Sequence, residues 1–175
     1  MAMNTLVFKF KDDGYIPNNP HLPVILVKEV FQDHPSDIEK IFNQHNWQNS
    51  WVNGVFPYHH YHSNAHEVLG VKAGTARLII GGESGKKITV QQGDVIILPA
   101  GTGHKKLECS NDFKIVGAYP EGMSYNIKTG EDNDRPQVLH DIVQVPLPMT
   151  DPIFGNRGPV FDHWHAKENP QISED

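Results

Sequence analysis

Short apolar runs separated by glycine-containing turns fill residues 54–119, and this pattern constrains the fold more than any other feature of the chain. Six such runs follow one another there: HEVLGV, TARLII, KKITV, DVIILP, HKKLEC and FKIVGAY. The connectors KAG, GGESG and QQGD supply glycines for the positive φ angles that tight reversals need. Because a series of short, evenly spaced strands closes most readily into a small barrel or jelly roll, the pattern predicts an all-β core.

The segments on either side of this core are expected to pack against it, so that the chain forms one domain. Residues 1–53 contain two short apolar runs that suit strands, LVFKF and PVILVKEV. They also contain SDIEKIFNQHNW, in which Ser36 and Glu39 form a capping-box pattern before apolar residues at helical spacing. This predicts one clear helix.

Residues 120–175 are expected to form a C-terminal extension that packs on the barrel or on a partner subunit. They are rich in Pro, Asp and Asn, with EDNDRP as a predicted exposed loop. The run QVLHDIVQVPL fits either a strand or a short helix.

Charge and hydropathy exclude several classes of partner. The formal charge of −6 and pI near 6.0 leave no basic stripe to neutralise phosphates, which argues against nucleic acid. No run approaches the roughly 18 apolar residues of a membrane span, and MAMNTLVFKFKDDG lacks the apolar region of a signal peptide. We therefore expect a cytoplasmic protein whose partner is a small molecule and not a membrane.

Four of the eleven histidines lie in PYHHYHSNAHE, residues 57–67. His60 and His62 are two positions apart, so on an extended strand their side chains share a face. Glu67 shares strand parity with Leu69, which places it inward and turns its neighbour His66 to the opposite face. Imidazoles and a carboxylate are ligands for divalent transition metals.

A further histidine, His104, follows the stiff turn LPAGTG. With it, the spacing resembles the two motifs of the cupin superfamily. The first motif is matched by Gly54, His60, His62, Glu67 and Gly74. The second is matched by Gly93, Pro99, Gly101 and His104, and departs from the pattern only at Glu108, where cupins have asparagine. The stretches YHSNAHEVLGV, LPAGTGH and DPIFG resemble small bacterial cupins of the YjlB type.

This resemblance implies a small, jelly-roll-like cupin β-barrel with one or two short peripheral helices. It also implies one divalent transition metal ion (Fe, Mn, Ni, Co or Zn) held by His60, His62, Glu67 and His104. Such sites leave one or two positions for water or substrate. Since three neutral imidazoles and one carboxylate leave a divalent site net positive, we expect an anionic small-molecule ligand. Cupins often pair, which makes a homodimer an expectation that rests on the resemblance alone.

Three charged residues are candidates for a catalytic role, although each has a simpler explanation. Lys106 and Glu108 share strand parity with His104, so that one could anchor an anion and the other act as a base. A solvated strand end is the favoured explanation for both. Arg77, which lies among apolar neighbours, could hold a substrate carboxylate or pair with an acidic side chain.

The remaining histidines are expected to lie outside the metal site. His59 and His66 are predicted to point outward from the cluster or to support it. His163 and His165 repeat the two-residue spacing, but no carboxylate and third histidine follow in register. We interpret FDHWHAKE as a C-terminal element that packs through Phe161 and Trp164.

Two classes of function stay open. The first is a metal-dependent enzyme acting on a small oxygen-rich metabolite, either as a dioxygenase or as an isomerase or decarboxylase. The second is a non-catalytic module that binds or senses a small ligand on its metal. The same ligands serve both classes, so the sequence does not choose between them.

Overall fold

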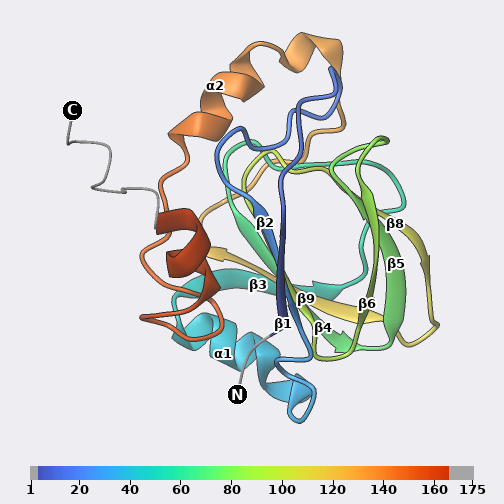
Figure 1. The fold of residues 1–175 in the computed structure, drawn as a ribbon, viewed down its shortest axis with the longest axis vertical. Helices are drawn as coiled ribbons and strands as arrows, with labels where there is room; N and C mark the ends of the chain where they lie inside the picture. Colours follow the sequence, from blue (N-terminus) through green and yellow to red (C-terminus); the bar gives the residue numbers. More distant parts are fainter. Residues whose placement is uncertain (1–3, 166–175) are drawn as a thin grey trace.

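The computed structural model describes residues 4–165 and consists of two antiparallel sheets with a few short helices (Figure 1). The strands are β1 (Asn4–Phe8), β2 (Val24–Lys28), β3 (Trp47–Asn53), β4 (Glu67–Ala73), β5 (Thr75–Ile80), β6 (Lys86–Gln91), β7 (Val95–Leu98), β8 (His104–Cys109) and β9 (Lys114–Pro120). The larger sheet has the order β1-β2-β7-β4-β9-β3, and the smaller one the order β6-β5-β8. The all-β core predicted from the sequence is confirmed at this level.

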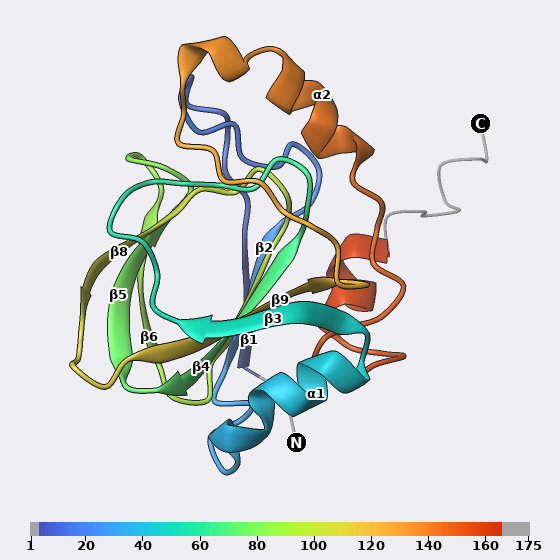
Figure 2. The same cartoon turned by 180° about the vertical axis from the view of Figure 1, so that it is seen from behind.

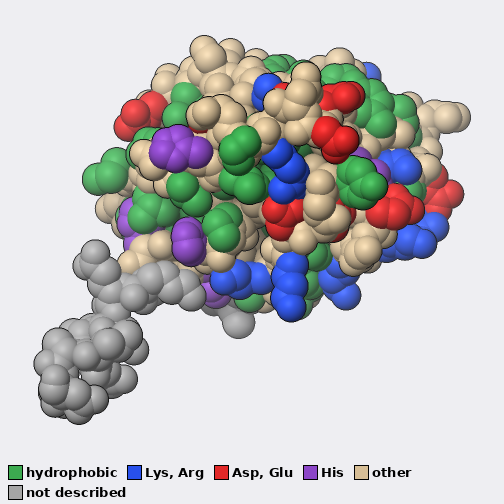
Figure 3. All heavy atoms as spheres, turned by 90° about the horizontal axis from the view of Figure 1, so that it is seen from above, with side chains coloured by type: hydrophobic (Ala, Val, Ile, Leu, Met, Phe, Trp, Pro, Cys, Tyr) green, Lys and Arg blue, Asp and Glu red, His purple; other side chains and the backbone are tan. Residues whose placement is uncertain are grey.

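The helical elements are short. They are η1 (Pro35–Asp37), α1 (Ile38–Gln44), η2 (Asp132–Asp134), α2 (Gln137–Gln144) and η3 (Phe161–His165), the last a turn of π-helix. Within residues 4–165, no helix is both long and apolar enough to cross a membrane. The end of the molecule that carries α2 shows hydrophobic side chains interspersed with acidic and basic ones (Figure 3).

Two layers of apolar side chains hold the larger sheet between them. Ile96 and Leu98 of β7 join the core shared with the smaller sheet, whereas Val95 and Ile97 join the core on the other face. Alternate residues of a strand point to opposite faces, so a strand buried on both faces is apolar at every position. This explains the unbroken apolar run that the sequence shows in DVIIL.

The second core is covered by α1 and by the C-terminal residues up to η3, which lie on the side of the larger sheet that faces away from β5, β6 and β8 (Figure 2). Ile38 and Phe42 of α1 are fully buried there, as is Trp164 of η3. Gly70 of β4 makes this close approach possible, because a Cβ at its position would lie 2.5 Å from Cγ2 of Ile38. Trp164 packs inward as the sequence predicted.

The predicted helix is present, but its predicted cap is wrong. Residues 35–37 form a 3₁₀ turn, the N-cap residue of α1 is Asp37, and no side chain caps the helix. Glu39 accepts a hydrogen bond of 2.7 Å from the hydroxyl of Ser50 on β3. The hydrogen bond between Glu39 and Ser50 on the neighbouring strand thus replaces the predicted capping contact between Glu39 and Ser36.

Glycines allow the turns that the connectors predicted. Gly74 and Gly93 have φ of +78° and +96°, and at Gly93 a Cβ would lie 2.6 Å from the backbone nitrogen of Gln32. Such positive values are readily adopted only by residues without a Cβ. Both turns lie at the end of the sheets away from the histidine cluster, because Gly74 follows β4 and Gly93 donates a hydrogen bond to Val71, whereas Glu67 begins β4.

Candidate metal centre

Three separate segments meet at the histidine cluster. His60 forms an isolated bridge with His104, the first residue of β8, through two backbone hydrogen bonds of 2.9 and 3.2 Å. His62 follows two residues later, and Glu67 is the first residue of β4. The cluster thus joins the larger sheet, which contributes Glu67, to the smaller sheet, which contributes His104.

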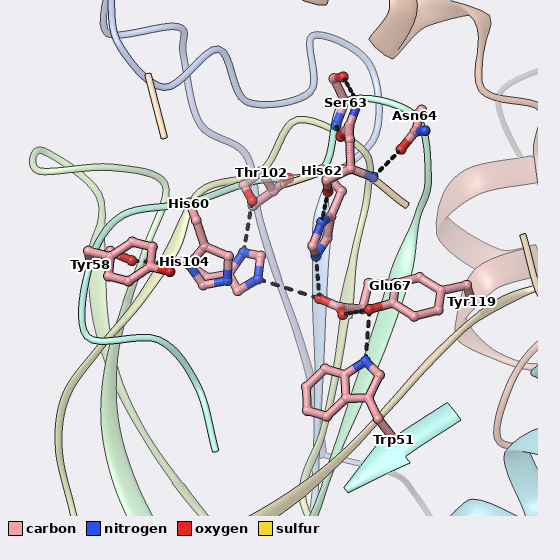
Figure 4. A network of polar contacts seen from close by, with 11 residues as sticks. Trp51, Tyr58, His60, His62, Ser63, Asn64, Glu67, Thr102, His104 and Tyr119 are labelled. Carbon is pink, nitrogen blue, oxygen red and sulfur yellow. Dashed lines mark hydrogen bonds and ion pairs between the residues drawn. The ribbon is translucent and has the colours of Figure 1, made fainter. Parts of the chain in front are cut away.

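The side chains of His62, Glu67 and His104 converge on one point (Figure 4). Oε1 of Glu67 lies 3.3 Å from Nε2 of His62 and 3.4 Å from Nε2 of His104. Among the described residues this trio alone places three ligand atoms within 4.8 Å of one another. The His60 ring lies against that of His104, with centroids 4.0 Å apart, so it borders the trio. All four side chains are buried.

Each imidazole is oriented by a backbone carbonyl. Nδ1 lies 3.0 Å from the Tyr58 oxygen in His60 and 3.0 Å from the Thr102 oxygen in His104. In His62 the partner is the Asn126 oxygen, at 2.5 Å. A carbonyl only accepts hydrogen bonds, so Nδ1 carries the proton in the neutral ring and Nε2 keeps its lone pair. This is how metal-ligating histidines are commonly held.

The carboxylate of Glu67 has one oxygen engaged and one free. Oε2 accepts a hydrogen bond of 2.5 Å from the hydroxyl of Tyr119, which in turn accepts one of 2.9 Å from the indole N–H of Trp51. Oε1 is buried and has no hydrogen-bond partner among the described residues. A buried oxygen without a partner costs free energy, which identifies Oε1 as the atom that needs a ligand.

The electrostatics of the cluster keep Glu67 ionised and His60 neutral. Burial lowers the pKa of His60 to about 3, and the nearby His104 and His62 add to the effect. Burial opposes ionisation of Glu67, but the neighbouring His62 and His104 outweigh it and lower the pKa of its carboxyl. For His62, burial is outweighed by the charge of Glu67, so its pKa is raised. A proton on Nε2 of His62 then lies where a cation would bind.

A cavity of about 260 Å³ opens beside these four side chains. Its other walls are largely apolar and aromatic, and come from Trp51, Val52, Asn53, Gly54, Val55, Phe56, Leu69, Tyr119, Tyr125 and Ile127. The rings of Tyr119 and Tyr125 are stacked, with centroids 4.2 Å apart and planes inclined by 17°. The arrangement can hold a cation at its polar end and a small molecule in the space above it.

The three charged candidates from the sequence lie away from this cavity. Arg77 and Glu108 are exposed and form an ion pair of 3.1 Å on the outside of the smaller sheet. Their pairing is one of the two arrangements that the sequence left open for Arg77. Lys106 is half-buried and does not line the cavity. A register shift between β5 and β8 at Arg77 and Leu78 breaks the strand parity of Glu108 with His104, whereas Lys106, opposite Leu78, keeps that parity.

The histidines expected outside the cluster are outside it. His59 pairs with Glu83 at the surface, at 2.7 Å. His66 lies on the opposite face of the larger sheet, where its Nδ1 accepts a hydrogen bond of 2.9 Å from the Ala100 N–H and its ring packs against Trp164. Burial lowers the pKa of His66 to about 4. Parity with Glu67 predicted this placement.

The C-terminal pair of histidines forms no second cluster within the described part of the chain. Nε2 of His165 lies 2.8 Å from the carbonyl oxygen of Pro148. Between the two histidines, the indole of Trp164 donates a hydrogen bond of 2.9 Å to the Pro23 oxygen. This segment anchors the C-terminal extension to the larger sheet.

Sequence reasoning missed four residues that shape the site: Trp51, Tyr119, Tyr125 and Asn126. Trp51 lies in a strand that the sequence did not predict, and Asn126 acts through its backbone oxygen. Asn126 also binds Ser63 through its side chain, with Oδ1 accepting from the Ser63 N–H at 2.8 Å and Nδ2 donating to its hydroxyl at 2.8 Å. The segment after β9 therefore both orients His62, through the Asn126 oxygen, and lines the cavity.

Comparison with known proteins agrees with this fold and cluster. The cupin domain family matches residues 47–109, a stretch that contains all four side chains of the cluster. The chain belongs to the cupin superfamily. Within it, the chain is 45% identical over 164 residues to the uncharacterized protein YjlB of Bacillus subtilis strain 168, covering 94% of this chain and 99% of that protein. It therefore belongs to the same family as YjlB.

Similarity to solved structures is partial. The TDP-quinovose 3,4-ketoisomerase WlaRB from Campylobacter jejuni matches with a TM-score of 0.41 and 14% identity, over 52% of this chain and 73% of that one. A DUF861 family protein from Thermotoga maritima matches with a TM-score of 0.34 and 21% identity, over 54% of this chain and 96% of that one.

Proposed function

We propose that the chain is a metal-dependent enzyme in which His60, His62, Glu67 and His104 hold one divalent transition metal ion. The observation that carries this proposal is Oε1 of Glu67, a buried carboxylate oxygen without a hydrogen bond that faces two imidazole nitrogens. A cation at the point where these atoms converge satisfies all of them. The cavity beside the cluster then receives a small, oxygen-rich metabolite.

The donor set fits such an ion. Three imidazoles and one carboxylate suit Fe, Mn, Ni, Co or Zn, whereas Mg and Ca prefer oxygen donors. Each ring is already turned with Nε2 free, so little reorganisation is needed on binding. The pKa of His60 of about 3 leaves that ring ready to bind without losing a proton first.

The ion, once bound, polarises substrate oxygens and, if it is redox-active, also supports oxygenase chemistry. The chain supplies the rest. Glu67 brings the single negative charge of the ligand set, Tyr119 and Trp51 fix its carboxylate, and the apolar walls exclude water from the bound substrate. The cavity gives access to the metal from one side, which distinguishes a catalytic from a closed structural site.

We extend this proposal to the architecture around the site. The two sheets share a core that includes Leu69 and Ile96 from the larger sheet and Leu78 and Val90 from the smaller one. A barrel closed around that core, as the cupin resemblance implies, would fix Glu67 and His104 relative to each other although they come from different sheets.

Metal analysis tests the proposal directly. Protein purified without an affinity tag should contain close to one equivalent of divalent transition metal, or take up one equivalent of Co(II) after treatment with a chelator. Replacing His62, Glu67 or His104 by alanine should abolish uptake. His59→Ala is the matched control, because His59 lies in the same segment but pairs with Glu83 at the surface.

His60→Ala sharpens this test. Its ring borders the trio, so the proposal predicts a clear loss of affinity, by tenfold or more. Wild-type protein that ignores added metal, or a His59→Ala protein that loses as much metal as His62→Ala, would refute the site.

A further inference from the structure

The cavity is lined by no cationic side chain that could neutralise a second negative charge. Among the described residues that line it, none is lysine or arginine. The polar end of the cavity consists of the four side chains of the cluster. The other ionisable side chains in its lining are those of Tyr119 and Tyr125. The hydroxyl of Tyr119 is already engaged by Trp51 and Glu67. The basic side chains predicted to anchor an anion, those of Arg77 and Lys106, lie elsewhere.

The charge of the loaded site follows from its ligands. Three neutral imidazoles and one carboxylate sum to −1, so a divalent ion leaves the centre at +1. A ligand that carries one negative charge on its metal-binding oxygens neutralises it. A second negative charge would lie among largely apolar walls without a cationic partner among the described residues, which is costly in a water-excluding site.

The walls of the cavity indicate what the rest of the ligand is made of. Val52, Phe56 and Ile127 line it and remain 40%, 42% and 46% exposed, so apolar surface surrounds its opening. Deeper in, the stacked rings of Tyr119 and Tyr125 meet the edge of His62, whose centroid lies 5.1 Å from that of Tyr125. Apolar surface of this kind is stabilised when a hydrophobic body covers it.

The volume limits the size of that body. About 260 Å³ encloses one ring together with a metal-binding group. The volume of the cavity, the charge of the metal-loaded site and the apolar walls thus all favour the same kind of ligand.

We infer that the ligand of this site is a monoanionic oxygen chelator that carries a single ring-sized apolar body. The inference rests on the proposed metal binding and adds the chemical class of the substrate. It predicts that the body of the ligand contributes affinity in this cavity, and that a dianion of the same size is disfavoured.

Three 2-hydroxy acids with the same chelating head test it: glycolate, mandelate and tartronate. They carry hydrogen, a phenyl ring and a second carboxylate, respectively, on the same carbon. Binding is measured by calorimetry and by the visible spectrum of Co(II)-loaded protein. We expect mandelate to bind at least tenfold more tightly than glycolate, because the ring is buried. Tartronate should bind more weakly than glycolate.

A variant at the opening provides the matched comparison. Ile127→Lys places a cation beside the bound ligand at a half-exposed position that holds no metal ligand, and Ile127→Met keeps the apolar wall. The lysine variant should bind mandelate less tightly and tartronate several-fold more tightly than wild type. The methionine variant should keep the wild-type order of affinities.

The possible failures are distinguishable. Protein that takes up no Co(II) overturns the proposed function and this inference with it. Protein that takes up one Co(II) but binds glycolate as tightly as mandelate, or tartronate most tightly of the three, overturns the ligand class and leaves the metal site standing.

Discussion

The phenol of Tyr119 and the carboxylate of Glu67 are joined by a hydrogen bond of 2.5 Å, and this bond decides which carboxylate oxygen remains free. The burial of Tyr119 and the charge of Glu67 both raise the pKa of the phenol, so it stays protonated and donates. Oε2 is thereby occupied, and only Oε1 faces the imidazoles. In the proposed metal centre, Glu67 would therefore bind the ion through Oε1 alone.

Tyr119→Phe removes this donor and keeps the ring. We expect the affinity for Co(II) to fall by about tenfold to a hundredfold, the usual cost of losing a residue that orients a metal ligand. Titration of metal-free protein with Co(II) measures it. Tyr125→Phe is the control, since its ring stacks on that of Tyr119 and its hydroxyl makes no hydrogen bond with the described residues. Equal losses in both variants would show that the Glu67 contact is unimportant.

Metal affinity should depend on pH through His62 more than through His60. The pKa of His62 is raised in the metal-free protein because the charge of Glu67 outweighs burial, so a proton competes with the metal as soon as the pH falls toward that raised value. His60, with a pKa of about 3, stays neutral throughout. Affinity for Co(II) should therefore be constant at high pH and begin to fall above pH 6.5. An unchanged affinity between pH 8 and pH 5 would contradict imidazole ligation.

The sequence predicted those residues of the site whose side chains recur at a fixed spacing. Strand parity separated Glu67 from His66, and the structure places them on opposite faces of the larger sheet. The orienting contacts were not predictable in this way. The carbonyls of Tyr58, Thr102 and Asn126 act through the backbone, and a backbone contact leaves no residue type to recognise.

Strand β3, which was not predicted from the sequence, shows a second reason why part of the site could not be predicted. Its residues WQNSWVN do not alternate, because a bulge between Gln48 and Trp51 shifts the register against β9. The bulge turns the indole of Trp51 into the cavity while Trp47 is buried on the other side, in the core under α1. A pattern search with a period of two cannot find a strand whose period is broken where it contributes to the site.

His66 should affect acid stability and leave metal binding intact. Its pKa is about 4 in the folded protein and close to 6.5 when unfolded, so below pH 6.5 the unfolded state binds a proton that the folded state does not. Stability is therefore lost as the pH falls from 6.5 toward 4, by about 3 kcal/mol in total from this residue. His66→Asn keeps an acceptor for the Ala100 N–H and cannot titrate.

Chemical denaturation of metal-free protein at several pH values measures this difference. The variant should lose less free energy of unfolding than wild type between pH 6.5 and pH 4, and its Co(II) affinity at pH 7.5 should be unchanged. Parallel pH profiles for the two proteins would exclude His66 as the source of the acid sensitivity.

Gly117 of β9 makes room for the indole of Trp51, since a Cβ at its position would overlap that ring. In Gly117→Ala the indole must move, which breaks its hydrogen bond to Tyr119 and reshapes the cavity wall. The bond from Tyr119 to Glu67 does not involve Trp51, so Co(II) uptake should remain near one equivalent. Affinity of the loaded protein for mandelate should fall several-fold, as measured by calorimetry.

Gly70→Ala is the matched control for this variant. Gly70 lies in the neighbouring strand, and a Cβ there meets Ile38 and Phe42 of α1 on the face away from the cavity. Overpacking of this kind costs about 1–3 kcal/mol of stability. Gly70→Ala should therefore lower the melting temperature while leaving mandelate affinity unchanged. If both glycine variants weakened mandelate binding equally, loss of stability would explain the effect, and the position of the Trp51 indole would have no specific role in the cavity.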